Sequence, residues 1–191
     1  LTSEAYRQCG RGGLGAVFGS KNLKSIAVRG TGAVHVPDMP SFLDTYREIM
    51  VARLRTDTNL WANTDGTPML VEATNSAGVF PTRGFTQGFF DGKDGINSDA
   101  VKAVLQRKRA CTNCPLACGR FTRNRRGEVV EGPEYEPIGL GGGNCGIDDM
   151  DALISYNRLC DNLGLDSIST GNVVGLAMTL TAEGIHDLGL R

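Results

Sequence analysis

Three cysteines fall within eight residues in the stretch CTNCPLAC, at Cys111, Cys114 and Cys118. The C-x2-C-x3-C spacing lets the chain turn back within each gap, so that three thiolates can face one metal centre. A tetrahedral zinc ion or a [4Fe–4S] cluster would each need a fourth ligand. A zinc site needs that ligand within this chain, where the candidates are Cys145, Cys160, His35 and His186. The spacing predicts a metal-binding loop and leaves zinc and iron–sulfur both open.

A glycine-rich and basic stretch, GRGGLGAVFGSKNLK, begins at Gly10. Glycines among cations let backbone N–H groups approach an anion closely, which predicts a phosphate ligand. The stretch does not follow the Walker pattern G-x4-G-K-[ST], because Ser20 precedes Lys21. Its GRGGLG portion has dinucleotide spacing, but no strand pattern comes before it. The pattern therefore indicates a phosphate without indicating a nucleotide.

Composition restricts the class of partner. The 191 residues carry a net charge of −1 and are 40% hydrophobic, a balance typical of a globular chain without bias toward nucleic acid or membrane. No apolar run reaches the roughly 18 residues that a membrane-spanning helix needs. The chain starts at Leu1 and shows no basic-then-apolar leader pattern. We therefore expect an internal piece of a longer, cytoplasmic protein with reduced cysteines.

The order of apolar residues predicts an α+β chain. Short strands are expected at 25–28 and 33–36. Helical spacing predicts helices at 41–56, 67–76, 98–109, 148–163 and 170–182. Ser41 and Asp148 are the expected N-caps of the first and fourth helices, and Gly164 is expected to end the fourth. An ordered loop is expected at 79–97, and a turn between two extended segments at 124–127.

A domain boundary is expected where this pattern changes. Residues 1–36 are interpreted as the C-terminal end of a β-rich domain. Residues 37–191 are interpreted as the first part of a mainly α-helical domain that carries the cysteine loop.

Carboxylates occupy two unusual positions. Asp161 lies in the last turn of the 148–163 helix, where it opposes the negative end of the helix dipole at a cost of about 0.3–1 kcal/mol. Together with Asp166 it could accept hydrogen bonds from a ligand rich in N–H donors. In EGPEYEP, Glu136 precedes Pro137 in a stiff segment, which suits a carboxylate held for proton transfer. Solvated surface carboxylates explain both patterns equally well.

Four motifs in order resemble the aldehyde:ferredoxin oxidoreductase family of tungsten or molybdenum bis-pterin enzymes. They are GRGGLGAVFGSKNLKSIAV, CTNCPLACGR, EGPEYEPIG followed by GNCGIDD, and LCDNLGLDSISTG. The resemblance extends over roughly residues 6 to 182. The D-x-x-G-L-D element from Asp161 to Asp166 is the most specific of the four.

The resemblance implies roles for particular residues. It implies that Cys111, Cys114 and Cys118 bind a [4Fe–4S] cluster and that Glu136 is the acid–base residue beside the metal. It also implies that the backbone carbonyl of Gln8 binds the Mg²⁺ that joins two pterin phosphates. The residues implied to contact the pterins are Arg7, Gln8, Gly10, Arg11, Asp161, Leu165 and Asp166. By this resemblance, residues 1–36 end a pterin-binding domain and residues 37–191 begin a cofactor- and cluster-binding domain.

The implied reaction is oxidation of an aldehyde to a carboxylic acid, with electrons leaving through the cluster to ferredoxin or a partner subunit. One departure concerns assembly: Ser155 stands where some members have a glutamate that binds an iron between subunits. A homodimer without that iron is the expected form, if one exists. Two alternatives stay open, the tungsten subunit of a benzoyl-coenzyme A reductase-type enzyme and a zinc-binding module without catalysis.

Overall fold

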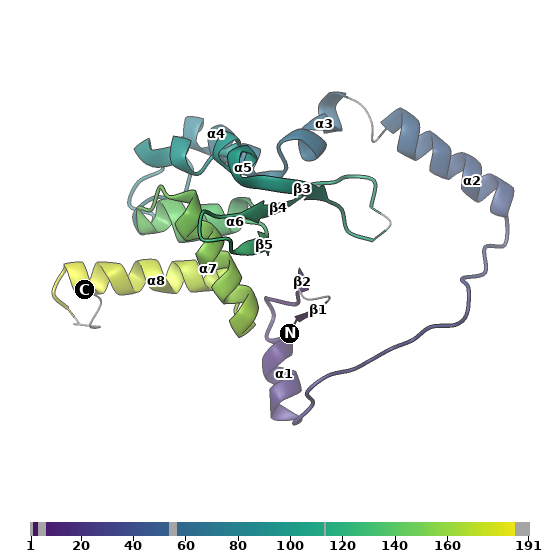
Figure 1. The fold of residues 1–191 in the computed structure, drawn as a ribbon, viewed down its shortest axis with the longest axis horizontal. Helices are drawn as coiled ribbons and strands as arrows, with labels where there is room; N and C mark the ends of the chain where they lie inside the picture. The colour runs from purple at the N-terminus through teal and green to yellow at the C-terminus, as the bar shows by residue number, and fades with distance from the viewer. Residues whose placement is uncertain (1, 4–6, 54–56, 113, 186–191) are drawn as a thin grey trace.

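The protein consists of a packed body and a thin N-terminal segment that reaches back to it (Figure 1). The computed structural model describes residues 2–3, 7–53, 57–112 and 114–185. At the N-terminus, β1 (Thr2–Ser3) and β2 (Arg7–Gln8) pair antiparallel and precede α1 (Leu14–Ser20). Helices dominate the body and surround one small sheet, so the predicted α+β class is confirmed.

The two strands predicted at 25–28 and 33–36 are wrong. Residues 23–36 follow an extended path without regular secondary structure and join α1 to α2 (Figure 1). Val28 is 87% exposed and Val34 is 89% exposed. A strand is stabilised by a partner strand and by burial of one face, and the described residues supply neither here. The domain boundary after residue 36 stays a prediction.

The predicted 41–56 helix is present with a different beginning. Helix α2 (Met39–Arg47) continues as the π-helical segment η1 (Glu48–Arg53), and the predicted residues 54–56 lie outside the described residues. Asp38 rather than Ser41 is the N-cap, because the Asp38 carboxylate accepts a hydrogen bond from the Ser41 N–H at 3.0 Å. Helix α3 (Asp57–Thr64) follows and was not predicted.

The next elements begin the body. The segments η2 (Thr67–Met69) and α4 (Leu70–Ser76) confirm the helix predicted at 67–76. The expected loop at 79–97 includes one short 3-10 segment, η3 (Asp91–Gly95). Helix α5 (Ser98–Val104) confirms only the first half of the helix predicted at 98–109.

A three-stranded antiparallel sheet replaces the second half of that helix. Strand β3 (Leu105–Arg109) pairs with β4 (Gly119–Arg123), which pairs with β5 (Val129–Glu131). Only the first residue of the LQRKR segment is apolar, so the helical stripe does not continue past Leu105, and pairing with β4 decides the conformation of the segment. The β4–β5 turn confirms the turn predicted at 124–127. The predicted cysteine loop connects β3 to β4.

Helices α7 (Met150–Leu163) and α8 (Ser167–Ala182) confirm the last two predicted helices. The N-cap of α7 is Asp149 rather than Asp148, because the Asp149 carboxylate accepts from the Asp151 N–H. Gly164 ends α7 as predicted, in the left-handed conformation with φ of 67°. Between the sheet and α7 lie α6 (Tyr135–Pro137), η4 (Ile138–Gly142) and η5 (Gly143–Cys145).

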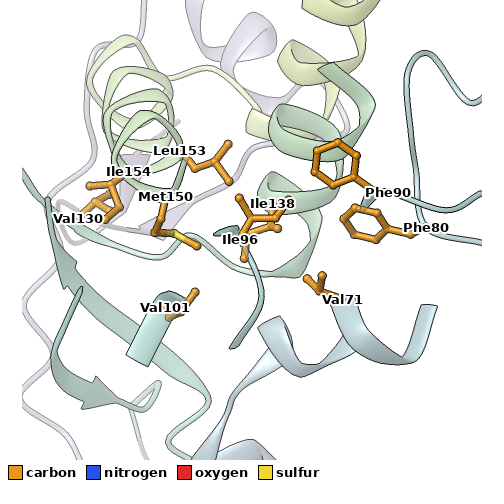
Figure 2. Packing of buried hydrophobic residues seen from close by; sticks show 10 residues of the cluster. All are labelled: Val71, Phe80, Phe90, Ile96, Val101, Val130, Ile138, Met150, Leu153 and Ile154. Carbon is orange, nitrogen blue, oxygen red and sulfur yellow. The ribbon is translucent and has the colours of Figure 1, made fainter. Parts of the chain in front are cut away.

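The hydrophobic core lies entirely in the body. Figure 2 shows side chains from α4, α5, β5, η4 and α7 in one cluster with Phe80, Phe90 and Ile96 of the 79–97 loop. Its members are Val71, Phe80, Phe90, Ile96, Val101, Val130, Ile138, Met150, Leu153 and Ile154. None of the described helices combines the length and the apolar character that a membrane crossing needs.

Candidate cofactor site

A cleft of about 340 Å³ lies between the N-terminal segment and the turn that joins α7 to α8. Residues separated by about 150 positions in the sequence meet in it. Its lining is Gln8, Gly10, Arg11, Asp161, Leu165, Asp166, Ser167 and Ile168. Six of the seven residues that the sequence suggests for pterin contact are therefore neighbours. The seventh, Arg7, lies in β2, and its side chain is outside the described part of the chain.

The α7–α8 turn places both aspartates of the D-x-x-G-L-D element. The Gly164 N–H donates to the Asp161 carbonyl at 3.3 Å, and the Leu165 N–H donates to the Cys160 carbonyl at 2.9 Å. These bonds reverse the chain immediately after α7, as glycine-ended helices commonly do. Asp166 then caps α8, and its carboxylate accepts from the Ser169 N–H at 2.9 Å. Asp161 and Asp166 therefore stand on opposite sides of one tight turn.

Arg11 links the N-terminal segment to this turn. Its Nε lies 3.6 Å from Asp166 Oδ2, while its side chain is 67% exposed. An ion pair this exposed contributes about 0–1 kcal/mol. Gly10 approaches the same carboxylate, because an added Cβ would lie 3.4 Å from Asp166 Oδ1. The segment therefore brings a cation and bare backbone to the cleft, which are the groups that bind phosphate.

Asp161 is half-buried in the last turn of α7. Burial raises the pKa of Asp161 to about 6, and the negative charge of Glu131 adds to the rise. Hydrogen bonds from Gln8 and Asn157 lower this pKa and so oppose the rise. Asn157 Nδ2 donates to Asp161 Oδ2 at 3.2 Å. At neutral pH the carboxylate is therefore an anion, held by neighbours from both sides of the cleft. It is placed to accept N–H donors of a ligand.

Sequence reasoning missed Asn157. It is buried, and it precedes Asp161 by four residues on α7, so the two side chains share one helix face. That i, i+4 spacing is the signal that could have identified it.

Glu136 does not line the cleft. It lies exposed in α6, between Tyr135 and the buried Pro137. In the same EGPEYEP segment, Glu134 accepts a hydrogen bond from the Thr67 hydroxyl, whose oxygen also accepts from the Tyr135 N–H at 3.0 Å. These contacts fix the segment against η2. The acid–base role of Glu136 stays a prediction.

The three clustered cysteines form a second region of interest. Cys111 and Cys114 are exposed, Cys118 is half-buried, and none is in a disulfide. The Cys114 N–H donates to the Cys111 carbonyl at 3.0 Å, so the chain turns back within the first gap. Burial raises the pKa of the Cys118 thiol, and the negative charges of Glu134 and of the other two cysteines add to this rise. The loop therefore begins with a tight turn at Cys111–Cys114 and ends at a partly buried thiol.

Within the described ranges, no three His, Cys, Asp or Glu side chains converge closely enough to hold a metal ion. The candidates for a fourth zinc ligand lie in different surroundings. Cys145 and Cys160 are buried, and the Cys145 thiol donates to the carbonyl of Leu140 at 3.4 Å. His35 lies exposed on the extended N-terminal segment, and His186 is outside the described residues. The same finding covers the three thiols of the cysteine loop, so zinc and iron–sulfur both stay open at this site.

Ser155 contacts the β4–β5 turn. Its hydroxyl donates to the Glu128 carboxylate and accepts from Asn124 Nδ2 at 3.0 Å. The side chain therefore joins α7 to the sheet, and the homodimer stays a prediction.

Comparison with known proteins identifies the family. Residues 45–190 match the family described as aldehyde ferredoxin oxidoreductase, domains 2 and 3, and residues 1–30 match its N-terminal domain. The chain belongs to the aldehyde ferredoxin oxidoreductase family. This agrees with the resemblance that the four motifs carry.

Individual relatives agree with this assignment. The tungsten-containing aldehyde ferredoxin oxidoreductase of Pyrococcus furiosus is 40% identical over 187 residues, which are 96% of this chain and 31% of the relative. The protein of the same name from Thermococcus kodakarensis gives the same identity and coverage. An aliphatic sulfonate oxidoreductase, WOR-like subunit, of Pyrococcus furiosus is 29% identical over 208 residues and is covered to 32%. The chain thus spans about a third of the length of the relatives it matches.

Proposed function

We propose that this chain is part of an oxidoreductase that oxidises an aldehyde to a carboxylic acid with a tungsten or molybdenum bis-pterin cofactor. Family membership and the names of the 40%-identical relatives support this proposal. The observation that carries it is the cleft. Six residues that the resemblance implicates together line one cavity: Gln8, Gly10, Arg11, Asp161, Leu165 and Asp166.

The residues present fit a pterin with a phosphate. Arg11 and the backbone at Gly10 supply a cation and close approach for the phosphate. Asp161 and Asp166 supply acceptors for pterin N–H groups, and Leu165 supplies an apolar wall. The backbone carbonyl of Gln8 is proposed as a Mg²⁺ ligand, because Mg²⁺ is coordinated by oxygen atoms. Arg7 belongs to the same proposed set.

The cysteine loop is proposed to carry the [4Fe–4S] cluster through Cys111, Cys114 and Cys118. Support comes from the turn between Cys111 and Cys114 and from three thiols on one loop that are outside any disulfide. When bound, the pterin metal supplies the two-electron oxidation, and the cluster accepts electrons singly for ferredoxin or a partner subunit. The residues of this chain bind and orient these groups.

Glu136 is proposed to move the proton during oxidation. Its position between Tyr135 and Pro137, in a segment held by Thr67, gives the carboxylate a stiff support. Replacing Glu136 with Gln should lower kcat for aldehyde oxidation by about 10²–10⁴-fold and leave metal content unchanged. Glu183→Gln, an exposed change at the end of α8, is the matched control. An unchanged kcat in Glu136→Gln would remove this role.

The substrate class needs its own test, because the sulfonate-named relative indicates that the family accepts different substrates. The full-length protein, purified without oxygen, should contain tungsten or molybdenum and about four irons per chain, and it should oxidise aldehydes. The same metals without aldehyde oxidation would favour a reductive or a sulfonate-directed enzyme. Zinc as the only metal would contradict the proposed function.

A further inference from the structure

Arg120 is the largest fully buried side chain in the described structure, with 0% exposure. It lies in β4, two residues after Cys118. Removing a cation from water costs free energy unless its donors and its charge are satisfied nearby. The free-energy cost of burying the Arg120 guanidinium must therefore be offset by specific contacts.

The guanidinium holds the chain on both sides of Cys118. Nη1 donates to the carbonyl of Ala117 at 2.8 Å and to the carbonyl of Gly119 at 3.1 Å. Nη2 reaches across to α3 and donates to the Ala62 carbonyl at 3.2 Å. A separate bond, from the Ala117 N–H to Asn63 Oδ1 at 2.9 Å, fastens the loop to the same helix. The backbone on both sides of Cys118 is thus held by Arg120, and the residue before it is also held by Asn63 of α3.

The packing around Arg120 leaves no room for a side chain at Gly66. A Cβ added at Gly66 would lie 2.6 Å from the Cys118 carbonyl oxygen and 2.9 Å from Arg120 Cζ. Gly66 also has φ of 66°, a conformation that favours glycine. The cysteine loop, Arg120 and Gly66 therefore form one close-packed unit.

The charge of Arg120 is only partly compensated. Among the described residues no carboxylate forms an ion pair with it, although Glu134, Asp65 and Cys118 act on it at longer range. The Arg120 Nε is buried and has no hydrogen-bond partner in the described structure. A buried cation with a spare donor therefore stands against the backbone of Cys118, the last of the three cysteines.

We propose that Arg120 positions the cysteine loop and that its buried charge raises the reduction potential of the cluster on Cys111, Cys114 and Cys118. This inference rests on the proposed function, because it requires an iron–sulfur cluster. Thiolate ligands add negative charge to a cluster, and nearby charge and hydrogen bonds set its potential. A fixed cation favours the reduced, more negative state and so eases electron uptake.

The test uses the full-length holoenzyme, purified without oxygen, and two variants. Arg120→Met keeps length and removes the charge, whereas Arg120→Lys keeps the charge. Iron content and the cluster midpoint potential, from an EPR-monitored redox titration, are the two readouts. We expect a more negative potential or lower iron content in Arg120→Met, and values near the unmodified enzyme in Arg120→Lys.

Two results would overturn the inference. One is an Arg120→Met enzyme with unchanged iron content and unchanged potential. The other is an equal shift of the midpoint potential in both variants, because lysine preserves the charge that the inference invokes. Failure of the proposed function looks different: the unmodified protein itself would then contain no iron–sulfur cluster.

Discussion

The body and the N-terminal segment contribute to the same cleft by different physical means. All ten members of the hydrophobic core come from residues 71 to 154. Helix α7, whose last turn carries Asp161, contributes Met150, Leu153 and Ile154 to that core. By contrast, α1 and α2 contain no buried residue. The α7–α8 wall of the cleft is therefore fixed by packing, whereas the segment from Gln8 to Arg11 is fixed by a few polar contacts. One wall is preformed, and the other has little packing of its own.

The first test of this contrast truncates apolar side chains in the two regions. Ile154 in α7 is fully buried, so Ile154→Ala should lower the free energy of unfolding by about 2–5 kcal/mol. Ile26 on the extended segment is mostly exposed, and Ile26→Ala should change it by less than about 0.5 kcal/mol. Urea denaturation measures both. Similar losses in the two variants would show that the segment is packed as tightly as the body.

Two glycines separate backbone strain from packing. Gly164 and Gly12 both have positive φ, and an added Cβ would meet nothing within 4 Å at either position. Alanine costs about 1 kcal/mol of backbone strain in such a conformation. Gly164→Ala should lower the thermal midpoint, because its turn belongs to the packed body. Gly12→Ala should leave that midpoint unchanged, and an equal drop would argue against the contrast.

The pH dependence of stability tests the buried side of the cleft. The pKa of Asp161 is raised from 3.8 to about 6 in the folded protein. Between these values the folded state keeps a proton that the unfolded state loses. The contribution of this group is therefore fully present below about pH 3.8 and is lost as the pH rises through 6.

Asp161→Asn should remove that dependence. The free energy of unfolding of the unmodified protein should fall by roughly 1 kcal/mol more between pH 4 and pH 7 than that of the variant. This value is reduced for the partial exposure of the carboxyl group. Urea midpoints at the two pH values give the comparison. Asp44→Asn, an exposed change in α2, is the control. Parallel pH profiles for Asp161→Asn and the unmodified protein would mean that the carboxyl titrates normally.

The smallest stability effect is expected at Arg11. Its ion pair with Asp166 is exposed, so Arg11→Gln should change the free energy of unfolding by no more than about 0.5 kcal/mol. The same variant should bind the phosphate end of the cofactor less tightly and lower the pterin content of the full-length protein. Full pterin content in Arg11→Gln would remove Arg11 from the proposed site.

Local patterns predicted the elements whose determinants lie close together in sequence. The apolar stripe of α7, the glycine after it and the turn near Gly127 are such cases. The capping residues were one or more positions off at Asp38 and Asp149, because neighbouring polar side chains compete and only geometry decides between them. The strands at 25–28 and 33–36 were wrong because β-propensity without a partner does not make a strand.

The interior of the candidate site depended on contacts that no local pattern reveals. Arg120 donates a hydrogen bond to the carbonyl of Ala62, which is 58 positions away. Gln8, near the start of the chain, donates one to Asp161 in the last turn of α7. A lone arginine after CxxxCG is an ordinary surface cation by pattern, and only the packing of Gly66 and α3 makes it buried. The chemical types of residue were readable from the sequence, whereas their partners required the fold.

The most direct test of the central claim is the metal and pterin content of full-length Asp161→Ala, purified without oxygen beside the unmodified protein. Asp99→Ala, an exposed change outside the cleft, is the control. The account predicts that Asp161→Ala loses pterin and tungsten or molybdenum while keeping its iron, because the cleft and the cysteine loop are separate regions. Retained pterin and tungsten with loss of iron would contradict it.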